Sequence, residues 1–190
     1  MTQKGVAVLL SVKIRAINMI AAIVSLAGLA TFTHAASAQV SFDPGIAQTD
    51  SLSFGAGVFD INDGWTSAAV QFEYAAKERF WIFHPIIGVM ANSDMGGDVY
   101  AGVGVDLFFG DRWVVTPSFA PSLYWRGSSE NLGEALEFRS SIGAAYRLDD
   151  TSRLGLEFYH LSNAGLDSHN PGTEVLLAKY SVPFDRILSK

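Results

Sequence analysis

Period-two alternation of apolar and polar side chains is the feature of this sequence that most restricts its fold. Between residues 99 and 109, every odd position is apolar, whereas the even positions are mixed and include two glycines and Asp106. Residues 136–148 alternate in the same way, with Phe138 on one face and Arg139 on the other. Successive side chains of a β-strand point to opposite faces of the sheet, so this pattern predicts strands with one apolar face and one small or charged face.

Eight such segments follow one another and predict an all-β chain. Most are long enough for the ~9–11 residues of a tilted membrane-spanning strand. Residues 110–112 and 149–151 carry the glycine and aspartates typical of tight turns between strands. The expected strands are residues 51–60, 66–75, 80–91, 98–109, 113–126, 135–148, 152–163 and 173–184.

Two architectures fit this alternation. A soluble sandwich would turn the apolar faces inward, whereas a membrane barrel turns them toward lipid and keeps polar side chains in its lumen. The barrel is favoured because the polar faces carry both signs of charge, such as Arg139 and Glu157, which can pair in a narrow lumen. Trp113 and Trp125 also lie near strand ends, as in interfacial aromatic girdles. We therefore predict an all-β, eight-stranded antiparallel transmembrane β-barrel.

The first 38 residues have the layout of a secretory signal peptide. A basic start precedes an apolar run at residues 20–32, and Ala36-Ser37-Ala38 supplies small residues for cleavage. The alternative is an uncleaved anchor, although the run is short for the ~20 residues of a spanning helix. We expect residues 1–38 to be removed, leaving residues 39–190 as a single barrel domain in the outer membrane of a Gram-negative cell.

Composition and loop lengths restrict the function and the orientation. With 13 Lys and Arg against 19 Asp and Glu, the chain lacks the basic surface that nucleic-acid binding requires. It has no cysteine, and its histidines are not spaced as metal ligands, so no metal is expected. His84 beside Pro85 is interpreted as structural, and His169 as a loop residue. Outer-membrane barrels have short periplasmic turns and longer outer loops. The connections expected inside are residues 76–79, 110–112 and 149–151, and those expected outside include 92–97, 127–134 and 164–172.

Three polar residues interrupt the apolar faces of the last two segments. His160 and Ser162 continue the face that carries Leu154 and Leu156, near the outer end of their strand. If the hairpin is symmetric about residue 167, Glu174 lies opposite His160, with Cβ atoms ~5 Å apart. A hydroxyl, an imidazole and a carboxylate would then meet, as acyl transfer requires. Ser162 is the expected nucleophile, His160 the general base and Glu174 the residue that orients the imidazole.

Two groups are candidates for stabilising an oxyanion. The Asn163 side-chain amide follows the nucleophile directly, and the backbone N–H of Gly165 lies in the same loop. Taken alone, His-x-Ser is a weak signal that also fits interfacial polar residues at a strand end. The agreement of face, height and partner favours the catalytic interpretation.

The last hairpin resembles the lipid A 3-O-deacylase family of the PagL type. The resemblance rests on residues 160–165, His-Leu-Ser-Asn-Ala-Gly, on the Asn170-Pro171-Gly172 turn, and on the step from His160 to Glu174. It covers residues 159–184. It implies a Ser-His-Glu triad on the outer wall of an eight-stranded barrel, with lipid A of lipopolysaccharide as substrate and the 3-position acyl chain as the group removed. It implies no cofactor.

Other functions remain open at this point. A small barrel can serve adhesion or envelope integrity without catalysis, and the same triad could hydrolyse phospholipid. Apart from substrate and outer-membrane lipid, a homodimer is the one partner left open. The family barrels usually end on an aromatic residue, whereas here Phe184 is followed by residues 185–190.

Overall fold

The computed structural model describes residues 40–42, 49–62 and 66–188. The expected signal peptide, residues 1–38, lies outside these residues, so its removal and the domain start at residue 39 stay predictions. None of the described residues belongs to a helix that is both long and apolar enough to cross a bilayer.

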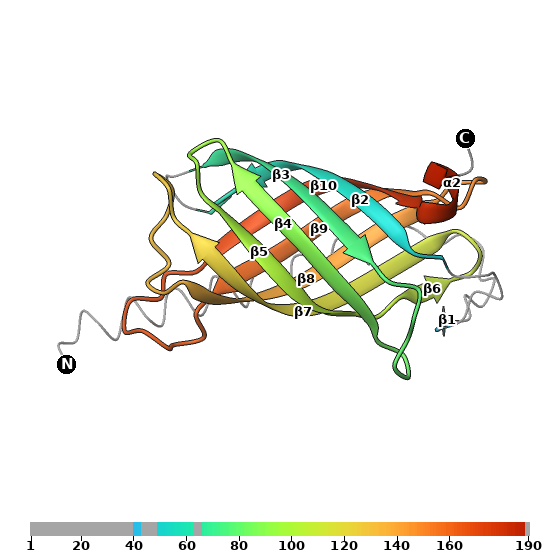
Figure 1. The fold of residues 1–190 in the computed structure, drawn as a ribbon, viewed down its shortest axis with the longest axis horizontal. Helices are drawn as coiled ribbons and strands as arrows, with labels where there is room; N and C mark the ends of the chain where they lie inside the picture. Colours follow the sequence, from blue (N-terminus) through green and yellow to red (C-terminus); the bar gives the residue numbers. More distant parts are fainter. Residues whose placement is uncertain (1–39, 43–48, 63–65, 189–190) are drawn as a thin grey trace, which may run out of the picture. The chain divides into compact units, whose positions relative to one another are not determined.

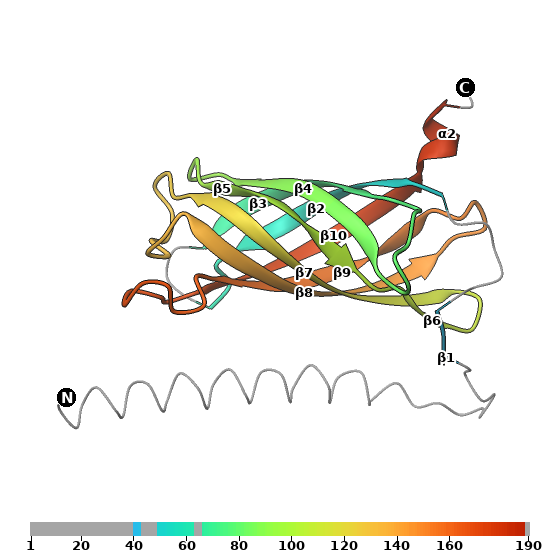
Figure 2. The same ribbon diagram turned by 60° about the horizontal axis from the view of Figure 1, so that its bottom comes forward.

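The described part of the chain consists of strands and one short helix. The elements are β1 (Val40–Ser41), β2 (Ser51–Phe59), β3 (Ser67–Ala75), β4 (His84–Asn92), β5 (Gly97–Gly104), β6 (Leu107–Phe109), β7 (Trp113–Trp125), β8 (Leu136–Arg147), β9 (Arg153–Ser162), β10 (Thr173–Pro183) and α2 (Phe184–Leu188). Phe184 therefore begins a helix and does not end the last strand. Figure 2 shows this helix projecting from the end of the barrel where β10 stops.

The sheet closes on itself. Neighbours pair antiparallel in the order β2-β3-β4-β5-β7-β8-β9-β10, and β10 pairs back with β2 from Val175↔Phe59 to Pro183↔Ser51 (Figure 1). Closure leaves no open sheet edge, so the backbone groups of the wall are hydrogen-bonded within it. Because β6 continues the line of β5 along β7, the wall has eight strands. The predicted eight-stranded antiparallel barrel is confirmed.

The connection between β3 and β4 differs from the prediction. The third strand was expected at residues 80–91 but begins at His84. Phe80 and Phe83 instead exchange two backbone hydrogen bonds, of 2.9 and 3.1 Å, around Trp81, whose φ is 62°. These apolar residues form a tight turn of their own, so the connection 76–83 is longer than the connection 93–96. The sequence had predicted the opposite, a short connection at 76–79 and a longer one at 92–97.

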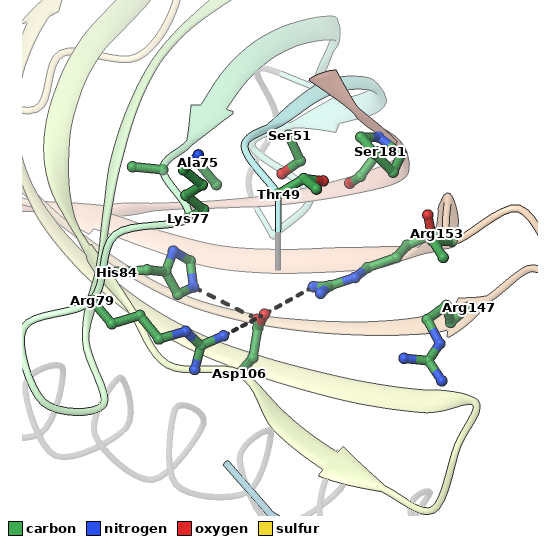
Figure 3. A pocket seen from close by; sticks show the side chains of 13 residues that line it. Thr49, Ser51, Ala75, Lys77, Arg79, His84, Asp106, Arg147, Arg153 and Ser181 are labelled. Atoms are coloured by element: carbon green, nitrogen blue, oxygen red, sulfur yellow. Dashed lines mark hydrogen bonds and ion pairs between the residues drawn. The ribbon is translucent and has the colours of Figure 1, made fainter. Parts of the chain in front are cut away.

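The strand expected at residues 98–109 is interrupted between β5 and β6 by Asp106. Its buried carboxylate lies 3.0 Å from the Arg153 guanidinium and 3.5 Å from that of Arg79, and it accepts a 2.7 Å hydrogen bond from Thr116. Figure 3 shows Arg79, Arg153 and His84 converging on it. The break lets one carboxylate join side chains from separate elements, which alternation alone does not reveal.

The barrel is apolar outside and polar inside. Phe72, Phe119 and Leu156 are at least half exposed on the outer wall. Trp113 and Trp125 are exposed at opposite ends of β7, where interfacial aromatics are expected. Large apolar side chains on the outside and charged ones inside are the pattern of a transmembrane barrel, not of a soluble one.

Buried charges form a connected network in the lumen. The Arg139 guanidinium lies 3.1 Å from the Glu157 carboxylate and 3.4 Å from the centre of the Tyr159 ring. Lys179 Nζ lies 2.6 Å from Glu73 and 3.1 Å from Glu157. Each charge faces an opposite charge, which offsets the cost of removing both from water. The network connects strands on different sides of the lumen.

We expect Glu157→Gln to lower the free energy of unfolding by about 3–5 kcal/mol, because it leaves the buried Arg139 without its carboxylate. Urea unfolding in detergent micelles, followed by the gel mobility of the folded barrel, measures the change. The matched control is Asp149→Asn, which breaks the exposed Arg112–Asp149 pair and should leave the unfolding midpoint unchanged. Equal stability of Glu157→Gln and wild type would contradict a stabilising role for the network.

Candidate active site

The outer face of β9 carries two of the predicted catalytic side chains. Tyr159 and Leu161 point into the lumen and have no exposed surface, whereas Leu156 is exposed on the outer wall. His160 and Ser162 alternate with the lumen residues and therefore face outward. The His160 side chain is 43% exposed. The alternation in the sequence had predicted this placement.

Strand β10 places Glu174 directly opposite His160. The Glu174 Oε1 atom lies 3.1 Å from His160 Nδ1, within hydrogen-bond distance. The next pair, Val175↔Tyr159, points into the lumen, so a slip of one residue would turn the carboxylate inward as well. The pairing expected from symmetry about residue 167 is confirmed.

Ser162 lies two residues beyond His160 on the same face, a step of about 7 Å along a strand. Across the sheet it faces Phe138 of β8. A second serine, Ser140 of β8, lies directly opposite His160. Among the described residues, neither hydroxyl is hydrogen-bonded to the imidazole. The structure thus joins the imidazole to the carboxylate and places two hydroxyls beside them.

Asn163 and Gly165 do not occupy the expected oxyanion site. The Asn163 Nδ2 atom donates to the carbonyl oxygens of Leu132, at 2.9 Å, and of His169, at 3.0 Å. Its Oδ1 atom accepts the Gly165 N–H at 2.9 Å, and the whole residue is buried. These donors are used within the protein, which corrects the expectation that they face the reacting ester. The reason is tertiary, because Leu132 belongs to the loop between β7 and β8.

The backbone N–H of Ala164, in the loop between β9 and β10, is not used in a hydrogen bond among the described residues. The N–H of Asn163 donates to the Asn170 side chain, and the N–H of Leu166 donates to the Asn163 carbonyl. Ala164 has a φ of 54°, a left-handed conformation that is uncommon for residues other than glycine. Sequence reasoning did not single it out.

Two further residues contact the imidazole–carboxylate pair. Gly172, the end of the predicted turn, has a φ of 70°, and a Cβ atom added there would lie 2.6 Å from His160 Cε1. Asn62, from the loop between β2 and β3, donates a 2.6 Å hydrogen bond to Glu174 Oε2. Nothing in the sequence pointed to Asn62, because its loop is distant along the chain and looks like an ordinary turn.

The other two histidines of the described residues lie apart from this pair. His84 is buried in the lumen, 3.6 Å from the Asp106 carboxylate. His169 is exposed, and its ring lies 2.9 Å from the Asn131 carbonyl oxygen. The His169 backbone N–H donates to Asp167 and holds the pKa of that carboxyl below its ordinary value. No group of three or more potential metal ligands occurs within the described residues.

The fold and this geometry define a transmembrane barrel with an imidazole–carboxylate pair on its lipid-facing wall. The chain belongs to the family described as Lipid A 3-O-deacylase (PagL), whose sequence profile matches residues 27–183. The resemblance seen in the last hairpin is therefore confirmed, and it extends over most of the chain.

Individual relatives agree with this assignment. The chain is 27% identical over 121 residues to Lipid A deacylase PagL of Bordetella bronchiseptica, covering 63% of this chain and 51% of that protein. It is 32% identical over 85 residues to Lipid A deacylase PagL of Pseudomonas aeruginosa, covering 45% and 41%. The chain thus spans about half the length, or less, of these curated relatives.

A solved structure supports the fold. The crystal structure of the outer membrane enzyme PagL matches with a TM-score of 0.56 at 19% identity, covering 70% of this chain and 99% of that one. With the family membership and the apolar outer wall, this places the chain in the outer membrane, as predicted.

We expect Asn163→Ala to loosen the two loops that its amide connects, because the carbonyls of Leu132 and His169 lose their shared donor. Hydrogen exchange measured by mass spectrometry should be faster in residues 128–135 and 163–172, while the strands stay protected. Asn131→Ala, in an exposed neighbouring position, is the control and should change exchange much less. Unchanged exchange in Asn163→Ala would show that other contacts hold the loops.

Proposed function

We propose that this protein hydrolyses the ester bond of the 3-position acyl chain of lipid A, using Ser162 as nucleophile, His160 as general base and Glu174 as the residue that orients the imidazole. The observation that carries the proposal is the 3.1 Å contact between His160 Nδ1 and Glu174 Oε1 on the lipid-facing wall, with Ser162 on the same face. Membership of the lipid A 3-O-deacylase family supports the choice of substrate.

The contact with Glu174 determines which ring nitrogen reacts. Because Nδ1 faces the carboxylate, Nε2 is the nitrogen available to Ser162. In the first step, Nε2 takes the Ser162 proton as Oγ attacks the ester carbonyl carbon. The resulting imidazolium then gives that proton to the sugar oxygen, which leaves as the carbon–oxygen bond breaks. Glu174 stabilises the imidazolium between these two transfers.

The second half of the reaction regenerates the serine. A water molecule gives a proton to His160 Nε2 and attacks the acyl–Ser162 ester, and the proton returns to Ser162 Oγ as the free fatty acid leaves. Negative charge forms on the carbonyl oxygen in both halves. We assign the Ala164 N–H as a donor to this oxygen, because it lies two residues from Ser162 and is not used in the loop.

The position of the site suits a lipid substrate. Ser162 faces Phe138, and Phe138 stacks on Phe119 with ring centres 6.1 Å apart. An acyl chain can lie along this apolar wall, where little of it contacts water. The ester and the sugar would then lie at the strand ends, beside the exposed residues of the loop 163–172.

We expect Ser162→Ala to lower the rate of fatty-acid release from lipid A by on the order of 10⁴-fold or more, since nucleophilic attack is lost. Ser140→Ala is the matched control, because Ser140 also adjoins His160 and its loss should leave the rate within a few-fold of wild type. Mass spectrometry of the lipid A product identifies the position of the lost chain. Equal release by Ser162→Ala and wild type would refute the catalytic role. Release from phospholipid alone would refute the substrate.

Gly172→Ala should lower the rate of fatty-acid release by about 100-fold, since a displacement of about 1 Å in a catalytic group has an effect of this size. The added Cβ would lie 2.6 Å from His160 Cε1 and displace the ring. Gly110→Ala is the control for backbone strain, because Gly110 has a similar φ of 61° and open space around the added atom. Equal rates for the two variants would show that the imidazole does not depend on this contact.

A further inference from the structure

Three consecutive residues after β2 contact two consecutive residues at the start of β10. The Thr173 hydroxyl donates to Asp60 Oδ1 at 2.9 Å, and the Ile61 N–H donates to the Glu174 carbonyl at 3.1 Å. The Asn62 side-chain amide donates to Glu174 Oε2 at 2.6 Å. These three residues are far from β10 in the sequence, and they adjoin it only because the barrel closes by pairing β2 with β10 (Figure 1).

We propose that Asn62 is a positioning residue that holds the Glu174 carboxylate in the rotation at which it can orient His160, an inference that rests on the proposed function. Glu174 has one oxygen for each neighbour: Oε1 lies against His160 and Oε2 accepts from Asn62. With both oxygens occupied, rotation of the carboxylate breaks two contacts at once. The site therefore includes Asn62, which follows β2, in addition to residues of β9 and β10.

An amide is well suited to this role because it donates a hydrogen bond without carrying a charge. A lysine or arginine in its place would form an ion pair with Glu174 and compete with the imidazolium for the carboxylate. Asn62 restricts the geometry of Glu174 and leaves the negative charge available to His160. The Glu174 side chain is only 20% exposed, so few solvent contacts are available to replace the amide.

The backbone before Asn62 is shaped to present it. Asp60 is buried and has a φ of 59°, a left-handed conformation that costs free energy in a residue with a side chain. Its contact with Thr173 fixes the turn that ends β2, and the Ile61 N–H ties the next residue to the backbone of Glu174. This turn therefore places the Asn62 side chain beside the Glu174 carboxylate. Strained residues of this kind persist where surrounding contacts hold them.

The test compares Asn62→Ala, Asn62→Asp and Asn62→Gln in the full-length protein in detergent, with lipid A as substrate. Asn62→Asp has nearly the same shape, but its ionised carboxylate cannot donate to Glu174 and repels it, so loss of packing cannot explain its effect. We expect kcat to fall about 10- to 100-fold in Asn62→Ala and Asn62→Asp, by analogy with the loss of a hydrogen-bond partner of a metal-binding histidine or carboxylate. KM should change little, and Asn62→Gln, which keeps the amide, should retain more activity than either.

A second readout does not depend on lipid A binding. The rate at which a fluorophosphonate labels Ser162 reports activation of the nucleophile, and it should fall in parallel with kcat. Asn131→Ala, at an exposed asparagine of the loop between β7 and β8, should label at the wild-type rate. Gel mobility of the folded barrel checks that each variant folds.

The outcomes separate this inference from the proposed function. If Ser162→Ala retains activity, the proposed function fails whatever Asn62 does. If Ser162→Ala is inactive but Asn62→Asp keeps the wild-type kcat and labelling rate, Asn62 does not position Glu174. A rise in KM with unchanged kcat would assign Asn62 to substrate binding and would also overturn the inference.

Discussion

The pairing of β10 with β2 is the interaction on which the rest of this structure depends. A sheet exposed to lipid has no water to satisfy its edge, so the first and last strands of the wall must bond to each other. The nine paired positions from Val175↔Phe59 to Pro183↔Ser51 provide that closure. The same pairing puts Ile61 and Asn62, which follow β2, beside Glu174. The requirement that keeps the barrel in a membrane thus also completes the surroundings of the candidate site.

The wall separates two environments for charge. In the lumen, the cations Arg139 and Lys179 lie at short range from the carboxylates of Glu157 and Glu73, which makes the barrel interior a structural ion network. On the outer face, His160 and Glu174 form a pair bordered by apolar side chains. Polar groups beside lipid are costly and usually functional. The inner charges are therefore explained by their structural pairing, whereas the outer pair is the candidate catalytic site.

Much of the site could be predicted because it lies in one hairpin. Strand alternation determines which face His160 and Ser162 occupy, and the register of an antiparallel hairpin determines that Glu174 faces His160. The same reasoning did not identify the oxyanion donors, because Asn163 and Gly165, which it suggested, are used within the protein. The Asn163 amide binds Leu132 from another loop, and that contact depends on how two loops pack at the end of the closed barrel.

The sequence by itself determined the strand pattern, the apolar outer wall and the pairing of imidazole with carboxylate, because each follows from side chains alternating along neighbouring strands. It did not determine the tight turn at Phe80 and Phe83 or the break at Asp106, where local contacts override a strand-like pattern. The contact between Asn62 and Glu174 was decided only by the tertiary structure. Asn62 and Glu174 are 112 positions apart and become neighbours only when the first and last strands of the sheet pair. No local sequence pattern indicates that contact.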